Sequence, residues 1–322
     1  MRALEPGGVP GRSGGRWTLG PRSGALPAHG GQGISPTLFV SRTTLCDVLD
    51  ALADHRDALV VVGSHAVHER TAGVMDYSTS TKDADIAVVP VLISAGPTIE
   101  DQLRGIGLRP LCEIVEHPAH RRYTDQPGLW GKGFDDNGQP VSEVDLLVPA
   151  ALSGGATDDS DQAPPATAHH GSMATRATSG IELAASDREL LSVTSFADGS
   201  VRRAWVAGIP SLLCAKTYKL HDRVTRREKT GRDRVVAKDG GDIWRLMAAS
   251  DPESVATTFG YLADDDQVGP VAQTGVARLR QLINSGELRT LALDDLDDGG
   301  TGEVSDVYYD WTHTFMAATG RA

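Results

Sequence analysis

Two aspartates with one residue between them, Asp83 and Asp85 in "TKDADIAVV", stand at the head of an apolar, β-branched run. Successive side chains of a β-strand point to opposite faces of the sheet, so residues two apart share a face. Asp83 and Asp85 therefore project together, whereas Ile86 and Val88 point into the core. Like charges on one face repel each other, and this pattern leaves open whether solvent or a metal ion offsets the repulsion.

The surrounding sequence predicts an α/β (α+β) fold. The apolar run "ALVVV" indicates a buried strand that ends at Gly63 and Ser64, and "HAVHER" after it indicates a helix. We expect further strands at 111–117, 120–125 and 142–149, with a Gly-rich loop around Trp130. Helical spacing of apolar residues recurs at 41–57 and 98–107, so the sheet is predicted to be mixed, with flanking helices.

The chain is predicted to have three parts. Residues 1–36 are saturated with Gly, Pro, Ser and Arg, and we expect this segment to be disordered because it cannot bury enough apolar surface. Residues 37–208 form the sheet domain, with a flexible insertion at 153–180. Residues 209–322 carry apolar residues at helical spacing and are predicted to form a helical bundle.

The composition narrows the class of protein. The net charge of −12 argues against a broad basic surface for nucleic acid, although a local one remains compatible with it. No apolar run approaches the roughly 18 residues that span a bilayer, so no membrane is expected. Three widely spaced cysteines in apolar contexts indicate free thiols in a reducing compartment, and we expect a cytoplasmic protein.

A third aspartate, Asp145 in "VSEVDLLVP", also lies in an apolar β-rich run, where a carboxylate is costly unless it is paired. If this strand pairs beside residues 83–89, the three carboxylates converge. Oxygen ligands of this kind suit Mg²⁺ or Mn²⁺. The turn at Gly63 and Ser64 permits close backbone approach, and the helix after it offers free N–H groups to an anion. A metal-bridged nucleoside triphosphate is the ligand that both features suit.

Basic residues gather in the second half of the chain. Four of the six lysines lie between 216 and 238. On a helix, Lys216, Lys219 and Arg223 share one face because they stand at i, i+3 and i+7. We expect residues 222–238, with seven basic and three acidic side chains, to form a loop between helices. This loop is either a contact for an RNA backbone or a solvated segment.

The order of these motifs resembles that of the polymerase-beta-like nucleotidyltransferase superfamily. Residues 43–148 carry the resemblance through "VVGSHAV", "TKDADIAV" and "VSEVDLLV". The later motifs "LLCAKTYKLHDR" and "KDGGDIWRL" resemble the toxin-like AbiEii (MenT-like) branch. The resemblance implies transfer of a nucleoside monophosphate from a nucleoside triphosphate, with Mg²⁺ or Mn²⁺ bound by Asp83, Asp85 and Asp145. The implied nucleotide-binding residues are Gly63, Ser64, Lys216, Lys219 and Arg223.

The same resemblance implies that Lys216 holds the charge of the triphosphate and that Asp242 either orients Lys216 or assists the acceptor. Asp145 is the candidate for activating the acceptor. Toxin members of this branch modify tRNA, so tRNA and a neutralising antitoxin protein are the expected partners. Two alternatives remain: a nucleotidyltransferase that modifies small molecules of the aminoglycoside type, or a non-catalytic module that binds nucleotides or proteins.

Overall fold

A computed structural model describes residues 34–72, 81–153, 167–296 and 301–320 of the chain. Its main sheet has eight strands in the order β3-β4-β7-β2-β1-β10-β9, with β8 beside β7, and a separate ribbon pairs β5 with β6. The sheet contains both parallel and antiparallel pairs. The strands are β1 (Leu59–Val61), β2 (Asp83–Val88), β3 (Arg109–Pro110), β4 (Leu129–Gly131), β5 (Gly133–Phe134), β6 (Pro140–Val141), β7 (Glu143–Pro149), β8 (Arg176–Thr178), β9 (Arg188–Thr194) and β10 (Val201–Ala207).

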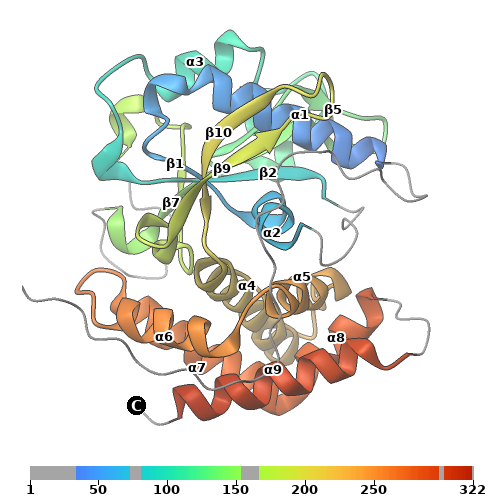
Figure 1. Ribbon diagram of the computed structural model, residues 1–322. Coiled ribbons are helices and arrows are strands. Elements are labelled where there is room, and N and C mark those ends of the chain that lie inside the picture. Colours follow the sequence, from blue (N-terminus) through green and yellow to red (C-terminus); the bar gives the residue numbers. More distant parts are fainter. Residues whose placement is uncertain (1–33, 73–80, 154–166, 297–300, 321–322) are drawn as a thin grey trace, which may run out of the picture. The chain divides into compact units, whose positions relative to one another are not determined.

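Helices flank this sheet and then continue as a helical region. Figure 1 shows α1 and α3 on one side of the sheet, and α2 with the later helices on the other. Helix α1 begins where the Ser35 hydroxyl accepts a hydrogen bond from the Leu38 N–H, with Pro36 in its first turn. The helices are α1 (Pro36–Ala51), α2 (Gly63–Thr71), α3 (Ile99–Gly105), α4 (Ile209–Thr230), α5 (Ala237–Ala248), α6 (Pro252–Ala263), α7 (Gly269–Ser285), α8 (Glu287–Asp295) and α9 (Glu303–Thr319). The fold is therefore mixed α/β with a helical C-terminal region, as predicted.

The core of the described residues runs from the sheet into the helical region. Buried apolar side chains of β1, β2 and β7 belong to the same hydrophobic cluster as those of α4, α5 and α9. Helices α5 and α8 approach closely at Gly240, where a Cβ would lie only 2.4 Å from the Cβ of Leu291. Helix α2 contacts both α4 and α5, so these helices are held directly against the element that follows β1.

The central pair of strands is β2 and β7, which run parallel. Asp85 is opposite Asp145 in the register, and Asp83 is opposite Glu143. The expected pairing of these two strands is thus confirmed. Because opposed residues of neighbouring strands project to the same face, the pairing places four carboxyl groups together.

Several local predictions were wrong between residues 111 and 131. In place of the strands expected at 111–117 and 120–125, the chain forms 3₁₀ helices at Leu111–Glu113 and Pro118–Tyr123. Trp130, which we expected in a loop, lies in strand β4 and is fully buried. Leu111 and Ile114 pack with Leu129 in a small separate cluster, whereas Trp130 belongs to the main core.

Three further segments differ from expectation. Residues 153–180 were predicted as a flexible insertion, yet 176–178 form β8, which pairs with β7. The basic segment 222–238 is not one loop, because α4 continues to Thr230 and ends at Gly231. Helix α8 was not predicted. Residues 1–33 of the segment predicted to be disordered lie outside the described residues.

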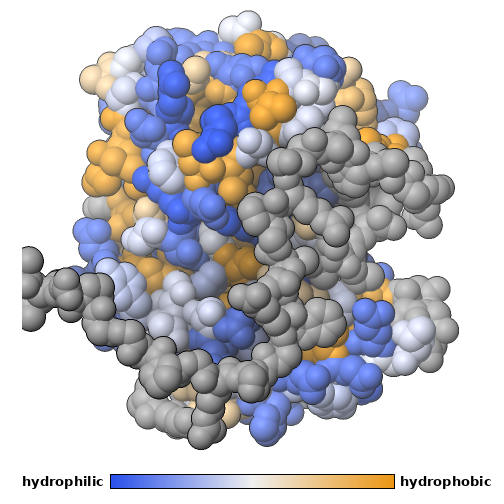
Figure 2. All heavy atoms as spheres, in the orientation of Figure 1, coloured by the Kyte–Doolittle hydropathy of each residue, from blue (hydrophilic) through white to orange (hydrophobic). Residues whose placement is uncertain are grey.

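No helix among the described residues is long and apolar enough to cross a membrane. On the face drawn in Figure 2, hydrophilic and hydrophobic side chains are interspersed where the atoms are coloured. The three cysteines are free thiols, and Cys46 and Cys214 are buried.

Candidate active site

The four carboxyl groups of β2 and β7 repel one another at the same end of the sheet. Burial raises the pKa of Asp85 to about 7, with added repulsion from Asp83 and Asp145. Burial likewise raises the pKa of Glu143 to about 8, again with repulsion from Asp83 and Asp145. Glu143 was not among the predicted site residues, although it stands two residues before Asp145 on the same strand face. The cluster therefore holds more negative charge than its surroundings neutralise.

Gly63 lies directly against this cluster at the first residue of α2. Its φ is +64°, a left-handed conformation that glycine adopts at little cost. A Cβ built on Gly63 would lie 1.9 Å from the Oδ2 atom of Asp85. The sequence predicts close approach of an anion to this turn, and in the structure the group that lies against Gly63 is the side chain of Asp85.

Asp145 has a cationic partner that the sequence did not reveal. The guanidinium of Arg176 donates from Nε to Oδ1 of Asp145 at 3.0 Å and from Nη2 to Oδ2. Burial raises the pKa of Asp145, and the ion pair with Arg176 partly offsets this. Arg176 lies in the short strand β8, inside the segment predicted as a flexible insertion, and no motif marked it.

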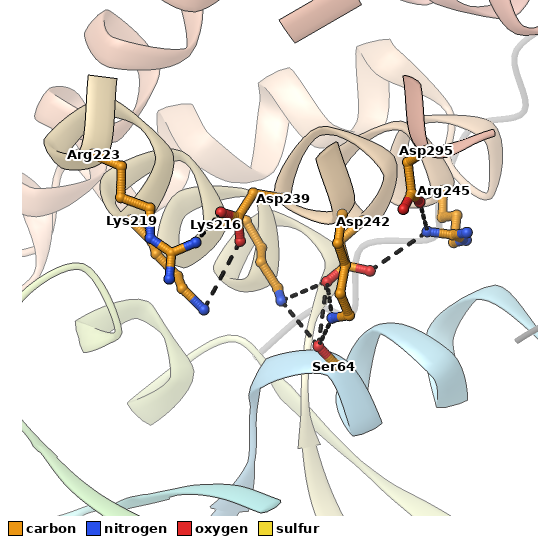
Figure 3. A network of polar contacts seen from close by, with 9 residues as sticks. Ser64, Lys216, Lys219, Arg223, Asp239, Asp242, Arg245 and Asp295 are labelled. Carbon is orange, nitrogen blue, oxygen red and sulfur yellow. Dashed lines mark hydrogen bonds and ion pairs between the residues drawn. The ribbon is translucent and has the colours of Figure 1, made fainter. Parts of the chain in front are cut away.

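Opposite the carboxyl groups, α4 and α5 supply a buried charge network. The Nζ atom of Lys216 lies 2.7 Å from Oδ2 of Asp242, and the Nζ atom of Lys238 lies 3.0 Å from the same oxygen. The Ser64 hydroxyl donates to this oxygen at 3.3 Å and accepts hydrogen bonds from both lysines. Figure 3 shows Ser64 and Lys216 converging on Asp242. From the other side, Nη1 of Arg245 lies 3.6 Å from Oδ1 of Asp242.

This network keeps Asp242 and Lys216 charged although both are buried. Burial opposes ionisation of Asp242, but Lys216 and Lys238 outweigh it and hold the pKa of Asp242 well below its usual range. Burial also opposes the charge of Lys216, and Asp242 outweighs it, so the pKa of Lys216 is raised. The pKa of Lys238 is lowered, mainly by burial and then by Lys216. Asp242 therefore fixes a charged Lys216 in place.

A second aspartate of α5, Asp239, pairs with the cations one and two turns further along α4. Asp239 forms an ion pair with Arg223, and the Nζ atom of Lys219 lies 3.9 Å from its Oδ1 atom. The three predicted cations of α4 thus lie along one helix, as their spacing indicated, and α5 supplies a carboxylate partner to each.

The two groups of charges face each other across one pocket of about 460 Å³. Seven of the nine predicted site residues line it, whereas Ser64 and Asp242 are not part of its lining. Asp242 is only 1% exposed and supports Lys216 from behind. The predicted site residues that line it are Gly63, Asp83, Asp85, Asp145, Lys216, Lys219 and Arg223. It is also lined by Arg176, which no motif marked, and by Arg226 and Arg234 from the basic segment 222–238.

The donor set suits a divalent cation. Clustered carboxylate oxygens are the ligands that Mg²⁺ and Mn²⁺ prefer, and a bound cation would relieve their mutual repulsion. Among the described residues, no group of three or more carboxyl, imidazole or thiol side chains is arranged so that it could hold a metal ion. One reason is visible in the contacts: both oxygens of Asp145 bind Arg176.

Comparisons of the chain with protein-family models, with curated proteins and with solved structures found no match.

Proposed function

We propose that this protein is a metal-dependent nucleotidyltransferase, which moves a nucleoside monophosphate from a nucleoside triphosphate to an acceptor. One observation carries the proposal: a single pocket has Asp83, Asp85 and Asp145 on its sheet side and a row of cations from α4 on the other. A triphosphate with a divalent cation binds best between cations and carboxylates, because the cations neutralise its negative charge and the carboxylates supply oxygen ligands to its metal.

Within that class, we propose a tRNA-modifying enzyme of the toxin type. Arg226 and Arg234 add positive charge to the same pocket without being needed for a single triphosphate. Further basic residues, among them Arg227, Lys229 and Arg232, stand at the end of α4 and just after it. Local positive charge beside the site suits an acceptor with a phosphate backbone, although the whole chain is acidic.

The residues divide the chemistry as follows. The acceptor hydroxyl attacks the α-phosphorus, a new P–O bond forms, and the bond to the pyrophosphate leaving group breaks. Lys216 neutralises charge on the phosphates, and Asp242 with Ser64 keeps its ammonium group in position. Asp145 is the candidate to receive the acceptor proton, since burial makes its carboxylate more basic. A divalent cation held by Asp83, Asp85 and Asp145 would supply electrostatic stabilisation of the phosphate oxygens.

The test is direct transfer of label. The full chain is incubated with Mg²⁺ and each α-labelled nucleoside triphosphate in turn, with total tRNA or an aminoglycoside panel as acceptor. The Asp83→Ala/Asp85→Ala variant should lose transfer. A matched control, Asp136→Ala/Asp266→Ala, removes the same charge from two exposed positions and should retain it.

Label on tRNA that depends on Asp83 and Asp85 supports the proposal. Label on a drug would instead support the small-molecule alternative. Equal labelling by the active-site variant and the wild type would overturn the assignment of these carboxylates. Nucleotide binding without transfer to any acceptor would favour the non-catalytic alternative.

A further inference from the structure

Arg176 reaches Asp145 because of the pairing between β8 and β7. Arg176 is opposite Leu147 in a parallel register, and Asp145 precedes Leu147 by two residues. Residues two apart on a strand share a face, so Arg176 and Asp145 lie diagonally on the same side of the sheet. The result is a bidentate pair, the strongest form of contact between a guanidinium and a carboxylate.

The two partners differ in their freedom to move. The Asp145 side chain is 9% exposed and belongs to a strand paired on both sides, with β2 on one and with β4 and β8 on the other. The Arg176 side chain is 37% exposed and lines the pocket. A long side chain at the pocket wall can leave Asp145 and still remain inside the pocket, whereas Asp145 cannot follow it.

We propose that Arg176 is a positioning residue that makes divalent cation and nucleoside triphosphate bind cooperatively. The inference rests on the proposed function, because it takes the metal and the triphosphate as ligands of this pocket. Without nucleotide, Arg176 occupies both oxygens of Asp145 and competes with a cation for them. A triphosphate offers Arg176 another anion in the same pocket, so Asp145 is released when the nucleotide arrives.

Cooperativity of this kind is reciprocal, since each ligand must change the affinity of the other by the same factor. Coupling between two sites on one protein typically amounts to roughly 5- to 150-fold. Removal of Arg176 should therefore strengthen metal binding by the nucleotide-free protein and weaken the coupling. We expect about a tenfold change both in the metal affinity of the nucleotide-free protein and in the coupling factor.

The experiment measures Mn²⁺ binding by the full chain, from the electron paramagnetic resonance signal of free Mn²⁺. Titrations are made with and without the α,β-methylene analogue of each nucleoside triphosphate, which cannot transfer its nucleotide. The variant Arg176→Gln removes the competitor, and Arg176→Lys keeps the charge but not the bidentate contact. Arg121→Gln is the matched control, because it removes an exposed arginine that does not line the pocket.

We expect Arg176→Gln to bind Mn²⁺ about tenfold more tightly than the wild type without nucleotide, and to gain about tenfold less from the analogue. Arg176→Lys should lie between the two, and Arg121→Gln should stay within about threefold of the wild type, as an exposed charge is largely screened. Direct contact between metal and phosphates contributes in every variant and cancels in the comparison.

Two other outcomes are informative in different ways. If Asp85→Asn abolishes Mn²⁺ binding but Arg176→Gln behaves as the wild type or as Arg121→Gln, the role of Arg176 is refuted while the proposed function stands. If no variant shows Mn²⁺ binding that depends on Asp85, the metal site of the proposed function is itself refuted, and the inference falls with it.

Discussion

The contact between Gly63 and Asp85 makes Gly63→Ala the most informative single substitution in this site. The new methyl group would lie 1.9 Å from Oδ2 and 2.8 Å from Cβ of Asp85, so Asp85 has to move. Its backbone cannot follow easily, because β2 is paired with β1 on one side and with β7 on the other. The substitution therefore perturbs the fold and the carboxyl cluster together.

Two costs add. A left-handed conformation costs a residue with a Cβ about 1–2 kcal/mol. Forcing an extra methyl group into a packed position costs about 1–3 kcal/mol. The free energy of unfolding should therefore fall by about 2–5 kcal/mol, a large share of the total of about 5–15 kcal/mol that is typical of a folded protein.

Urea denaturation at constant pH measures this loss, and Gly231→Ala provides the control. Gly231 has φ +67°, almost the same as the +64° of Gly63, but a Cβ there meets no atom within 4 Å. Gly231→Ala should cost only the backbone share of about 1–2 kcal/mol. Equal losses in the two variants would refute the clash with Asp85, whereas a smaller loss for Gly63→Ala in an Asp85→Ala background would support it.

Three other predictions concern stability. Because the pKa values of Asp85 and Glu143 are raised from the usual carboxyl range, about 4, to about 7 and about 8, the folded metal-free protein binds more protons than the unfolded chain between these limits. Its stability should therefore fall as pH rises from about 4 to about 8. Urea midpoints between pH 5 and 9, with and without Mg²⁺, test this, and a rise with pH would contradict it. Asp242→Asn leaves two lysines without their carboxylate and should cost about 3–5 kcal/mol, so a loss below about 1 kcal/mol would argue against a charged network. Gly240→Ala should lower the free energy of unfolding by about 1–3 kcal/mol, because the new methyl group pushes α8 away from α5. Gly260→Ala in α6 adds a Cβ in open space and should leave the stability unchanged or raise it, and thermal melts of the two variants test this difference.

The parts of the fold that could be predicted are those in which residue spacing and burial agree. Asp83 and Asp85 share a face because any strand places alternate residues together, and "VSEVDLLVP" is apolar enough to be a buried strand in almost any context. The cations of α4 were placed on one face by helical periodicity alone. Each of these predictions needed only local geometry.

The parts that could not be predicted depend on distant partners or on weak local signals. Strand β8 is three residues long, and only its pairing with β7 makes it a strand, so nothing local distinguished Arg176. Trp130 resembled a loop residue because glycines surround it, yet tertiary burial makes it part of β4. The end of α4 was taken for a loop because it lacks apolar residues, but Arg, Glu and Lys favour helix and Gly231 supplies the left-handed residue that ends it.

The register between β2 and β7 also bears on how such a chain can change in evolution. Insertion or deletion of a single residue between Glu143 and Asp145 would shift every later side chain of β7 to the opposite face. Asp145 would then enter the core, and an apolar neighbour would face the pocket. The loop between β5 and β6, residues 135–139, is by contrast largely exposed, and length changes there cost little. Descendants of this sequence should therefore vary in length in such exposed loops, while β2 and β7 gain or lose no residue.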